Sequence, residues 1–213
     1  MRVKEIAKKI LPNFIVEIRR RYIKNKIIVD WKKKGSPNPP PHIIKQLAIS
    51  HYKKLYNYKI LVETGTYLGN MIEAQKNNFK TIYSIEISET FFQQARERFK
   101  EDQHIHLILG DSGEKLKEVV YLLNDPAIFW LDGHYSGGNT SKGEKNTPIF
   151  NELKTILDNH FPHVILIDDA VDFNGTNDYP TIQEVVDFVL LQNASMKWEV
   201  KDNIISFYPK TNA

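Results

Sequence analysis

The sequence predicts an α/β fold with a doubly wound, mostly parallel sheet, a C-terminal antiparallel hairpin and an N-terminal helical appendage. Two observations support this prediction. Five short apolar segments alternate with segments of helical periodicity, which is typical of a parallel sheet covered on both faces. Two further β-type segments, 197–200 and 204–208, are joined across Asp202-Asn203, and this pattern predicts a hairpin.

The individual elements follow from hydrophobic periodicity and from the turn residues between segments. The first helix of the main domain is predicted over 42–56. The parallel strands are predicted at 60–62, 81–87, 104–109, 127–131 and 164–167. The helices that connect and follow them are predicted at 70–78, 90–100, 114–123, 146–159 and 181–191, with Pro148 in the first turn of its helix, where proline is tolerated.

The N-terminal segment, residues 1–34, is strongly basic. It holds 12 Lys and Arg against three acids, a net charge of +9, whereas the whole chain has a net charge of +3. Apolar residues recur at every fourth position, which predicts an amphipathic helix that Pro12 divides in two or restarts. Residues 35–41 hold four prolines and are predicted to be an extended linker to the main domain, residues 42–213.

Three roles for this basic segment are open from the sequence: contact with anionic lipid, contact with a polyanionic substrate, or a helical cap on the domain. No motif for reading nucleic acid is found, so no nucleic-acid partner is expected. There are no cysteines, which excludes disulfides, thiolate metal sites and a cysteine nucleophile. We expect a cytoplasmic protein, located at the inner face of the membrane if the segment binds lipid, and a homodimer is a further expectation.

The main domain is organised around a glycine turn after its first strand. Gly65 and Gly69 stand four residues apart in Glu-Thr-Gly-Thr-Tyr-Leu-Gly-Asn, between the strand and a helix that begins near Asn70. Glu86 ends the second strand about 20 residues later, a position from which an acid can accept hydrogen bonds from ribose hydroxyls. The glycine spacing differs from that of dinucleotide-binding turns, which disfavours an NAD-dependent oxidoreductase.

The turn and the order of elements over 58–208 resemble class I S-adenosylmethionine-dependent methyltransferases, whose fold is Rossmann-like. The resemblance places Glu63 near the methionine amino group of the cofactor and Glu86 on the ribose. It places Asp111 at the adenine, although an acid here also fits a helix N-cap. The full implied cofactor site is Glu63, Gly65, Thr66, Tyr67, Gly69, Asn70, Glu86, Ile87, Asp111, Ser112 and Asp132.

Acids also follow the fourth and fifth strands. Three carboxylates at adjacent strand ends repel one another unless a cation or protons intervene, and hard oxygen ligands suit Mg²⁺ or Ca²⁺. Leu-Asp-Gly-His-Tyr and Ile-Asp-Asp-Ala resemble macrocin-type O-methyltransferases. The resemblance implies that Asp132, Asp168 and Asp169 bind a divalent cation, with Mg²⁺ the expected ion, and that Asp132 also acts in catalysis.

His134 is the expected catalytic base, because it lies two residues after Asp132. Macrocin-type enzymes often carry a second acid at this position, so the roles of a fourth ligand, a substrate contact and a surface histidine stay open. A long polar loop, 135–147, follows and is expected to contact the acceptor through Tyr135, Lys142 and Glu144. It resembles a sequence in methyltransferases associated with surface-polysaccharide genes.

Two functions therefore compete. The favoured one is a metal-assisted, S-adenosylmethionine-dependent O-methyltransferase that acts on a hydroxyl of a sugar, a nucleotide sugar or a surface-polysaccharide precursor. The alternative is a non-catalytic nucleotide-binding module that the basic segment, residues 1–34, recruits to a membrane or a partner. The three carboxylates and His134 favour the enzyme, since a binding module does not need them.

Overall fold

The computed structural model describes residues 2–133 and 148–210, and within the first helix it describes side chains at residue 15 and from residue 18 onward. The chain forms two compact units, residues 1–45 and 46–213. The helices are α1 (Arg2–Lys33), α2 (His42–Tyr56), α3 (Asn70–Gln75), α4 (Glu89–Arg98), α5 (Ser112–Leu122), α6 (Ile149–Leu157), the short 3-10 helix η1 (Ala170–Asp172) and α7 (Ile182–Gln192). The strands are β1 (Ile60–Thr64), β2 (Thr81–Glu86), β3 (Ile105–Leu109), β4 (Ala127–Leu131), β5 (Val164–Ile167), β6 (Lys197–Lys201) and β7 (Ile204–Tyr208).

Within the described residues, one seven-stranded sheet organises the second unit, with the strand order β3-β2-β1-β4-β5-β7-β6. Strands β1 to β5 are parallel to one another. Strand β7 pairs antiparallel with β5, and β6 pairs antiparallel with β7. The predicted doubly wound sheet and its C-terminal hairpin are confirmed.

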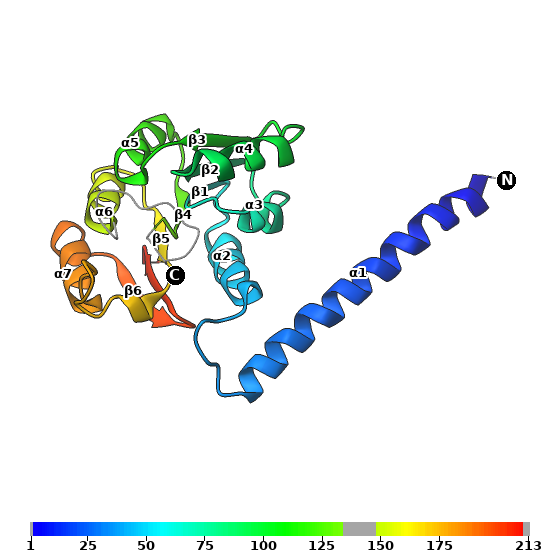
Figure 1. Cartoon of the computed structure of the whole chain (residues 1–213), viewed down its shortest axis with the longest axis horizontal. Coiled ribbons are helices and arrows are strands. Elements are labelled where there is room, and N and C mark those ends of the chain that lie inside the picture. The colour runs from blue at the N-terminus through cyan, green and yellow to red at the C-terminus, as the bar shows by residue number, and fades with distance from the viewer. Residues whose placement is uncertain (1, 134–147, 211–213) are drawn as a thin grey trace. The chain divides into compact units, whose positions relative to one another are not determined.

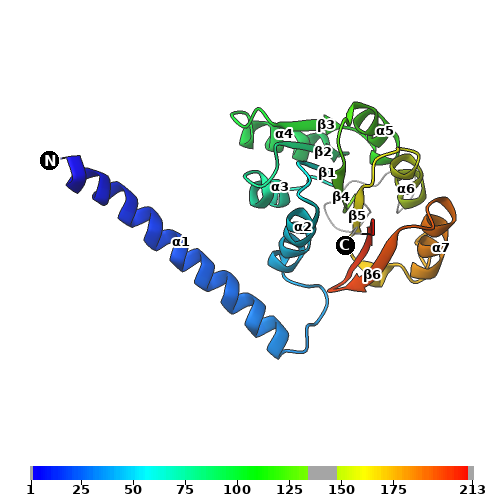
Figure 2. The ribbon, with the colours of Figure 1, turned by 180° about the vertical axis from the view of Figure 1, so that it is seen from behind.

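Helices cover both faces of this sheet. Alternate residues of a strand face opposite sides, so β1 contributes Val62 to one apolar cluster and Leu61 to the other. The first cluster includes buried residues of α5, α6 and α7, and the second includes buried residues of α2 and α3. Figures 1 and 2 show the same division, with α5 to α7 along one face and α2 to α4 along the other.

The strand order places the ends of β1 and β4 side by side. The chain runs outward from β1 to β2 and β3, then returns past β1 to β4. Such a reversal opens a crevice at the carboxyl ends of the strands, where ligands bind in open α/β sheets. Thr64 pairs with Leu131 at the last position of the β1–β4 register, so Gly65 and Asp132 leave the sheet next to each other.

Helix α1, in the first unit, runs without interruption through Pro12. The prediction that Pro12 divides this helix was wrong. Proline removes one backbone hydrogen bond, and the helix continues on both sides of it. At the other end of the helix, buried Trp31 donates a hydrogen bond from its indole N–H to the carbonyl of Pro37 at 2.8 Å.

No helix among the described residues has both the length and the apolar character needed to cross a membrane.

Most element boundaries differ from the predictions by one to three residues, and three of these differences lie next to the candidate site or change an element's length by two residues or more. Strand β1 extends to Thr64, because Glu63 and Thr64 still pair with both neighbouring strands. Helix α3 ends at Gln75, three residues early. Helix α6 starts at Ile149, with Pro148 at its N-cap, since proline has no amide hydrogen and is favoured at a helix start. The predicted start of this helix at residue 146 lies outside the described residues.

Candidate active site

The glycine turn after β1 touches the loop after β4 directly. Gly65 has a φ angle of +83°, and its amide donates a hydrogen bond to the carbonyl of Ile85 at 2.9 Å. A Cβ atom at Gly65 would lie 2.3 Å from the carbonyl oxygen of Asp132. Only glycine fits both the backbone angle and this distance. The predicted cofactor turn and the first predicted metal ligand are therefore neighbours.

Gly69 provides space for a different neighbour. Its φ angle is +70°, and a Cβ atom would lie 2.6 Å from the ring of Phe99, which caps the C-terminus of α4. Helix α3 begins at Asn70, as predicted, but it has only six residues. The Asn70 side chain accepts a hydrogen bond from Arg98 at 3.1 Å. Gly69 and Asn70 therefore fix the packing of α4 against the turn.

Glu86 joins the end of β2 to the turn. One oxygen of its carboxylate accepts a hydrogen bond from the backbone amide of Tyr67 at 2.7 Å, and the other accepts one from the amide of Ser88 at 2.8 Å. The side chain is buried. A carboxylate has about four lone-pair positions, so Glu86 keeps acceptor capacity for ligand hydroxyls while it holds the turn in place.

Tyr67 and Ile87 form an exposed apolar rim beside Glu86. Tyr67 has a φ angle of 48°, which is rare for a bulky residue and is typical of binding sites when the surroundings enforce it. Its ring packs edge-on against Phe91, with 4.7 Å between the centroids. The structure thus places both predicted residues at the surface next to the turn, where an apolar ligand surface can pack on them.

Glu63 lies inside the sheet, which corrects the prediction that it stands beyond the end of β1. It accepts a hydrogen bond from the hydroxyl of Ser84 at 2.6 Å, and Ser84 is also 2.6 Å from the hydroxyl of Thr66. Burial raises the pKa of Glu63 to about 8, and the charges of Asp132 and Glu86 add to the shift. The Ser84 hydrogen bond acts in the opposite direction. Glu63 is therefore mostly protonated at neutral pH.

Asp111 is the N-cap of α5, because its side chain accepts a hydrogen bond from the amide of Gly113 at 2.8 Å. Ser112, the first residue of α5, is buried. A Cβ atom at Gly133 would lie 3.1 Å from the hydroxyl oxygen of Ser112 and 3.0 Å from that of Thr64. The loops after β3 and β4 therefore meet, and they bring Ser112 close to the segment that carries Asp132.

The acids after β4 and β5 meet in one cluster. Asp132, Asp168 and Asp169 each offer a carboxylate oxygen, and these oxygens lie within 4.8 Å of one another. The backbone sets this geometry: the Asp132 amide donates to the carbonyl of Thr64 at 3.1 Å, and the Asp168 amide donates to that of Leu131 at 3.0 Å. Asp168 is fully buried. The structure brings together all three predicted ligands.

Asn203 orients one of these acids and was not identified from the sequence as a site residue. Its side-chain amide donates to Asp169 at 3.1 Å, and its side-chain carbonyl accepts from the Val171 amide at 2.9 Å. Asp169 itself has a φ angle of 50°. Asn203 belongs to the turn between β6 and β7, where asparagine is expected for its conformation alone. The sequence pattern therefore contained no signal for this second role.

Tyr179 also lies near the acids and was not predicted. The side chain is buried, and its ring packs edge-on against Phe173, 5.4 Å between centroids. Burial raises the pKa of its hydroxyl, and the charges of Asp172, Asp169 and Asp132 raise it further. Tyr179 therefore remains a neutral hydroxyl beside the cluster. It lies in an irregular segment after η1, where no periodicity indicates which side chains turn inward.

The remaining predicted residues cannot be placed. His134, Tyr135, Lys142 and Glu144 lie outside the described residues. The roles proposed for them as a base and as acceptor contacts stay predictions.

Comparisons with known proteins identify the fold. No family model matches the chain, and no curated protein matches it. Among solved structures, the chain is similar to the S-adenosylhomocysteine-bound methyltransferase PaMTH1 of Podospora anserina, with 17% identity over 92% of this chain and 96% of that one and a TM-score of 0.58. It is also similar to the O-methyltransferase TomG of Streptomyces achromogenes in complex with S-adenosylmethionine, with 15% identity, 89% coverage of both chains and a TM-score of 0.59.

A third similar structure is an O-methyltransferase of Bacillus cereus in complex with S-adenosylhomocysteine, with 14% identity, coverage of 88% of this chain and 90% of that one, and a TM-score of 0.56. The three alignments cover most of each chain, with TM-scores above 0.5. This chain therefore has the Rossmann-like fold of class I S-adenosylmethionine-dependent methyltransferases.

Proposed function

We propose that this protein is a divalent-metal-assisted O-methyltransferase that uses S-adenosylmethionine as its methyl donor. The observation that supports this most strongly is the position of the carboxylate cluster. Asp132, Asp168 and Asp169 lie within 4.8 Å of one another, and the backbone of Asp132 touches Gly65 of the cofactor turn. A methyl-donor site and a hydroxyl-binding site are needed side by side for methyl transfer, because the reacting atoms must lie about 3–3.5 Å apart.

The donor site is proposed to consist of the residues around the glycine turn. Glu86 accepts hydrogen bonds from the ribose hydroxyls with its remaining lone pairs, while Tyr67 and Ile87 cover the apolar surface of the ligand. Asp111 and Ser112, at the start of α5, are the proposed contacts of the adenine. Glu63 acts from inside the sheet through the hydroxyls of Ser84 and Thr66, so we revise its role from direct contact to positioning of the turn.

The carboxylate cluster fits a hard divalent cation. Three carboxylates this close repel one another unless positive charge intervenes, and their oxygen atoms suit Mg²⁺. Asp132, Asp168 and Asp169 would hold the ion, which when bound orients the acceptor hydroxyl and favours its ionised form. Asn203 holds Asp169 in position through its hydrogen bond. This hydrogen bond limits the orientations open to the Asp169 carboxylate.

The proposed reaction transfers one methyl group. The C–S⁺ bond of the donor breaks as the acceptor oxygen forms a bond to the methyl carbon, and the sulfur keeps the electron pair. The hydroxyl proton leaves to a base, for which His134 is the proposed residue, so the products are a methyl ether, S-adenosylhomocysteine and a proton. The described residues act mainly by positioning the donor and the acceptor, since the donor site follows β1 and the carboxylate cluster begins after the adjacent strand β4.

The proposed acceptor is a hydroxyl of a sugar, a nucleotide sugar or a surface-polysaccharide precursor. The support is the resemblance of the loop after Asp132, with Tyr135, Lys142 and Glu144 as its proposed acceptor contacts.

Replacing one proposed metal ligand distinguishes the metal site from the cofactor site. We expect Asp168→Asn to abolish methyl transfer and weaken Mg²⁺ binding while the affinity for S-adenosylhomocysteine stays nearly unchanged. The matched control is Asp187→Asn, which makes the same chemical change at an exposed position of α7. Calorimetric titration of both variants with Mg²⁺ and with S-adenosylhomocysteine provides the test. Equal loss of cofactor affinity and metal affinity in Asp168→Asn would contradict the metal assignment.

A further inference from the structure

Helix α1 presents an apolar stripe to solvent. Ile15, Ile18, Tyr22 and Val29 have exposed side-chain fractions of 59%, 53%, 68% and 47%. At 3.6 residues per turn, these four residues lie within about 60° of one another around the helix axis. Exposed apolar surface of this kind on a helix costs solvation free energy, so it indicates a partner.

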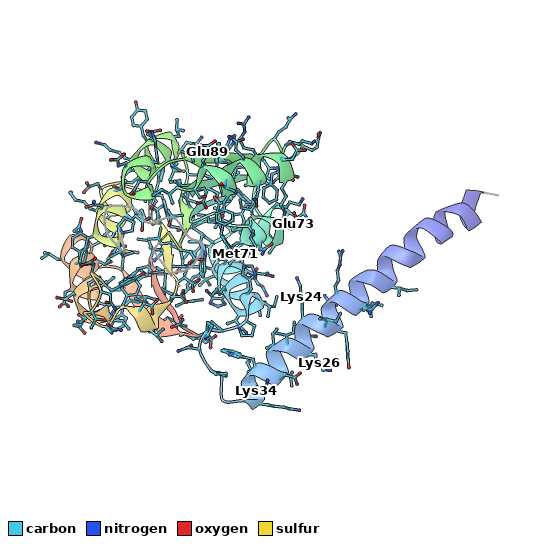
Figure 3. All side chains as sticks on the ribbon, viewed as in Figure 1. Lys24, Lys26, Lys34, Met71, Glu73 and Glu89 are labelled. Carbon is cyan, nitrogen blue, oxygen red and sulfur yellow. The ribbon has the colours of Figure 1, made fainter. Side chains whose placement is uncertain are left out.

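Cations lie along both sides of this stripe. Arg19 and Lys26 are adjacent to it on one side, and Arg21 and Lys32 lie on the other; all four are exposed. Figure 3 shows Lys24 and Lys26 projecting from the ribbon of α1. Long basic side chains can lay their methylene stems along an apolar surface while their charged ends reach phosphate groups. The partner must therefore combine apolar surface with negative charge.

A second copy of this helix fits the stripe poorly. Ile15, Ile18, Tyr22, Asn25 and Val29 follow the three-and-four spacing of a coiled-coil seam. In a parallel pair, however, the flanking positions would place Arg21 of one helix opposite Lys26 of the other. Two cations at this position repel each other, and no acid flanks the seam between residues 18 and 29 to offset them.

We propose that α1 lies in the surface of a membrane rich in anionic lipid, with the stripe at the boundary between headgroups and acyl chains and the flanking cations on the phosphates. An interfacial helix of this kind needs an apolar face, basic residues beside it and low overall hydrophobicity. Helix α1 has exposed apolar residues with cations beside them, its sequence is rich in Lys and Arg, and among the described residues no helix is apolar enough to span a bilayer. This inference stands independently of methyl transfer.

Vesicle binding of the full-length protein tests the proposal. We expect flotation with vesicles in which one lipid in three is phosphatidylglycerol, and at least tenfold weaker binding to pure phosphatidylcholine. Ile18→Ser combined with Tyr22→Ser leaves the net charge unchanged and should weaken binding to the anionic vesicles at least tenfold. An unchanged helical signal in circular dichroism and an unchanged urea unfolding midpoint in this variant show that the protein is folded.

A charge-matched pair of variants tests the orientation of the helix. Arg19→Gln with Lys26→Gln removes two cations beside the stripe, whereas Arg20→Gln with Lys24→Gln removes two from the opposite side. We expect the first variant to weaken vesicle binding several-fold more than the second. Equal effects would overturn the proposed face.

Two other results would overturn the proposal as a whole. One is a dimer in sedimentation experiments that Ile18→Ser with Tyr22→Ser dissociates, with no vesicle binding by the native protein. The other is tight binding of native protein to an RNA or DNA duplex that the same variant retains, again without vesicle binding.

Discussion

The close approach of the Asp132 carbonyl to Gly65 predicts a large effect of a very small substitution. Gly65→Ala adds one methyl group, which would lie 2.3 Å from the carbonyl oxygen of Asp132, at a φ angle of +83°. A left-handed conformation costs an L-residue roughly 1–2 kcal/mol, and forcing an extra carbon into a packed region costs roughly 1–3 kcal/mol. The free energy of unfolding should therefore fall by about 2–5 kcal/mol.

Gly175→Ala is the matched control for this substitution. Gly175 has nearly the same φ angle, +82°, but a Cβ atom there would meet only the side-chain methyl of Thr181, at 3.1 Å. We expect this variant to lose about 1–2 kcal/mol, the cost of the backbone conformation. Urea denaturation of both variants measures the difference. It should exceed about 1 kcal/mol, which corresponds to the cost of the clash with Asp132.

The same substitution should also weaken cofactor binding, because the loop that carries Asp132 must move away from the turn. Calorimetry with S-adenosylhomocysteine should show at least a tenfold loss of affinity in Gly65→Ala and little change in Gly175→Ala. If the two variants unfold at the same urea concentration and bind the ligand equally well, the inferred contact between the two loops is wrong.

Three further predictions follow from individual side chains. Replacement of Glu86 by Ala should weaken S-adenosylhomocysteine binding at least tenfold by calorimetry, and unchanged affinity would remove it from the ribose role. Burial lowers the pKa of His163 from 6.5 to about 4. The free energy of unfolding should therefore be at its full value above pH 6.5 and fall by roughly 3 kcal/mol as the pH drops from 6.5 to about 4, because the unfolded chain binds a proton that the folded one does not. In urea denaturation, His163→Gln should show a smaller loss over this pH range than the native protein. Burial raises the pKa of Glu63 from 4.5 to about 8, so Glu63 should reduce stability as the pH rises through this interval, and Glu63→Gln should lose less stability there than the native protein; an identical pH dependence in the variant would refute the raised pKa.

Much of the fold follows directly from the apolar pattern. Strands β4 and β5 have the predicted boundaries, because a run of apolar residues buried on both faces ends abruptly at Asp132 and at Asp168. The boundary of β1 was less predictable. Glu63 reads as a strand-end acid in the sequence, yet Ser84 on the adjacent strand provides the hydrogen bond that allows its burial. That pairing depends on the register, which the local sequence does not contain.

The candidate site shows the same difference between local and non-local information. Asp132, Asp168 and Asp169 were predicted because each follows a strand, and parallel strands end at one edge of a sheet. Asn203 and Tyr179 come from a hairpin turn and an irregular segment, and only the folded chain brings them to the acids. Gly69 was predicted as part of the cofactor site, and a Cβ atom there would meet the ring of Phe99 at the end of α4, a contact that the local sequence does not reveal.

The central proposal is tested most directly by calorimetric titration of the full-length protein with S-adenosylhomocysteine, first in EDTA and then with added Mg²⁺. We predict binding in both conditions, because the residues around Gly65 and Glu86 lie outside the carboxylate cluster. We also predict a separate Mg²⁺ binding signal that Asp168→Asn weakens. Absence of S-adenosylhomocysteine binding in both conditions would contradict the assignment of this chain as a methyltransferase.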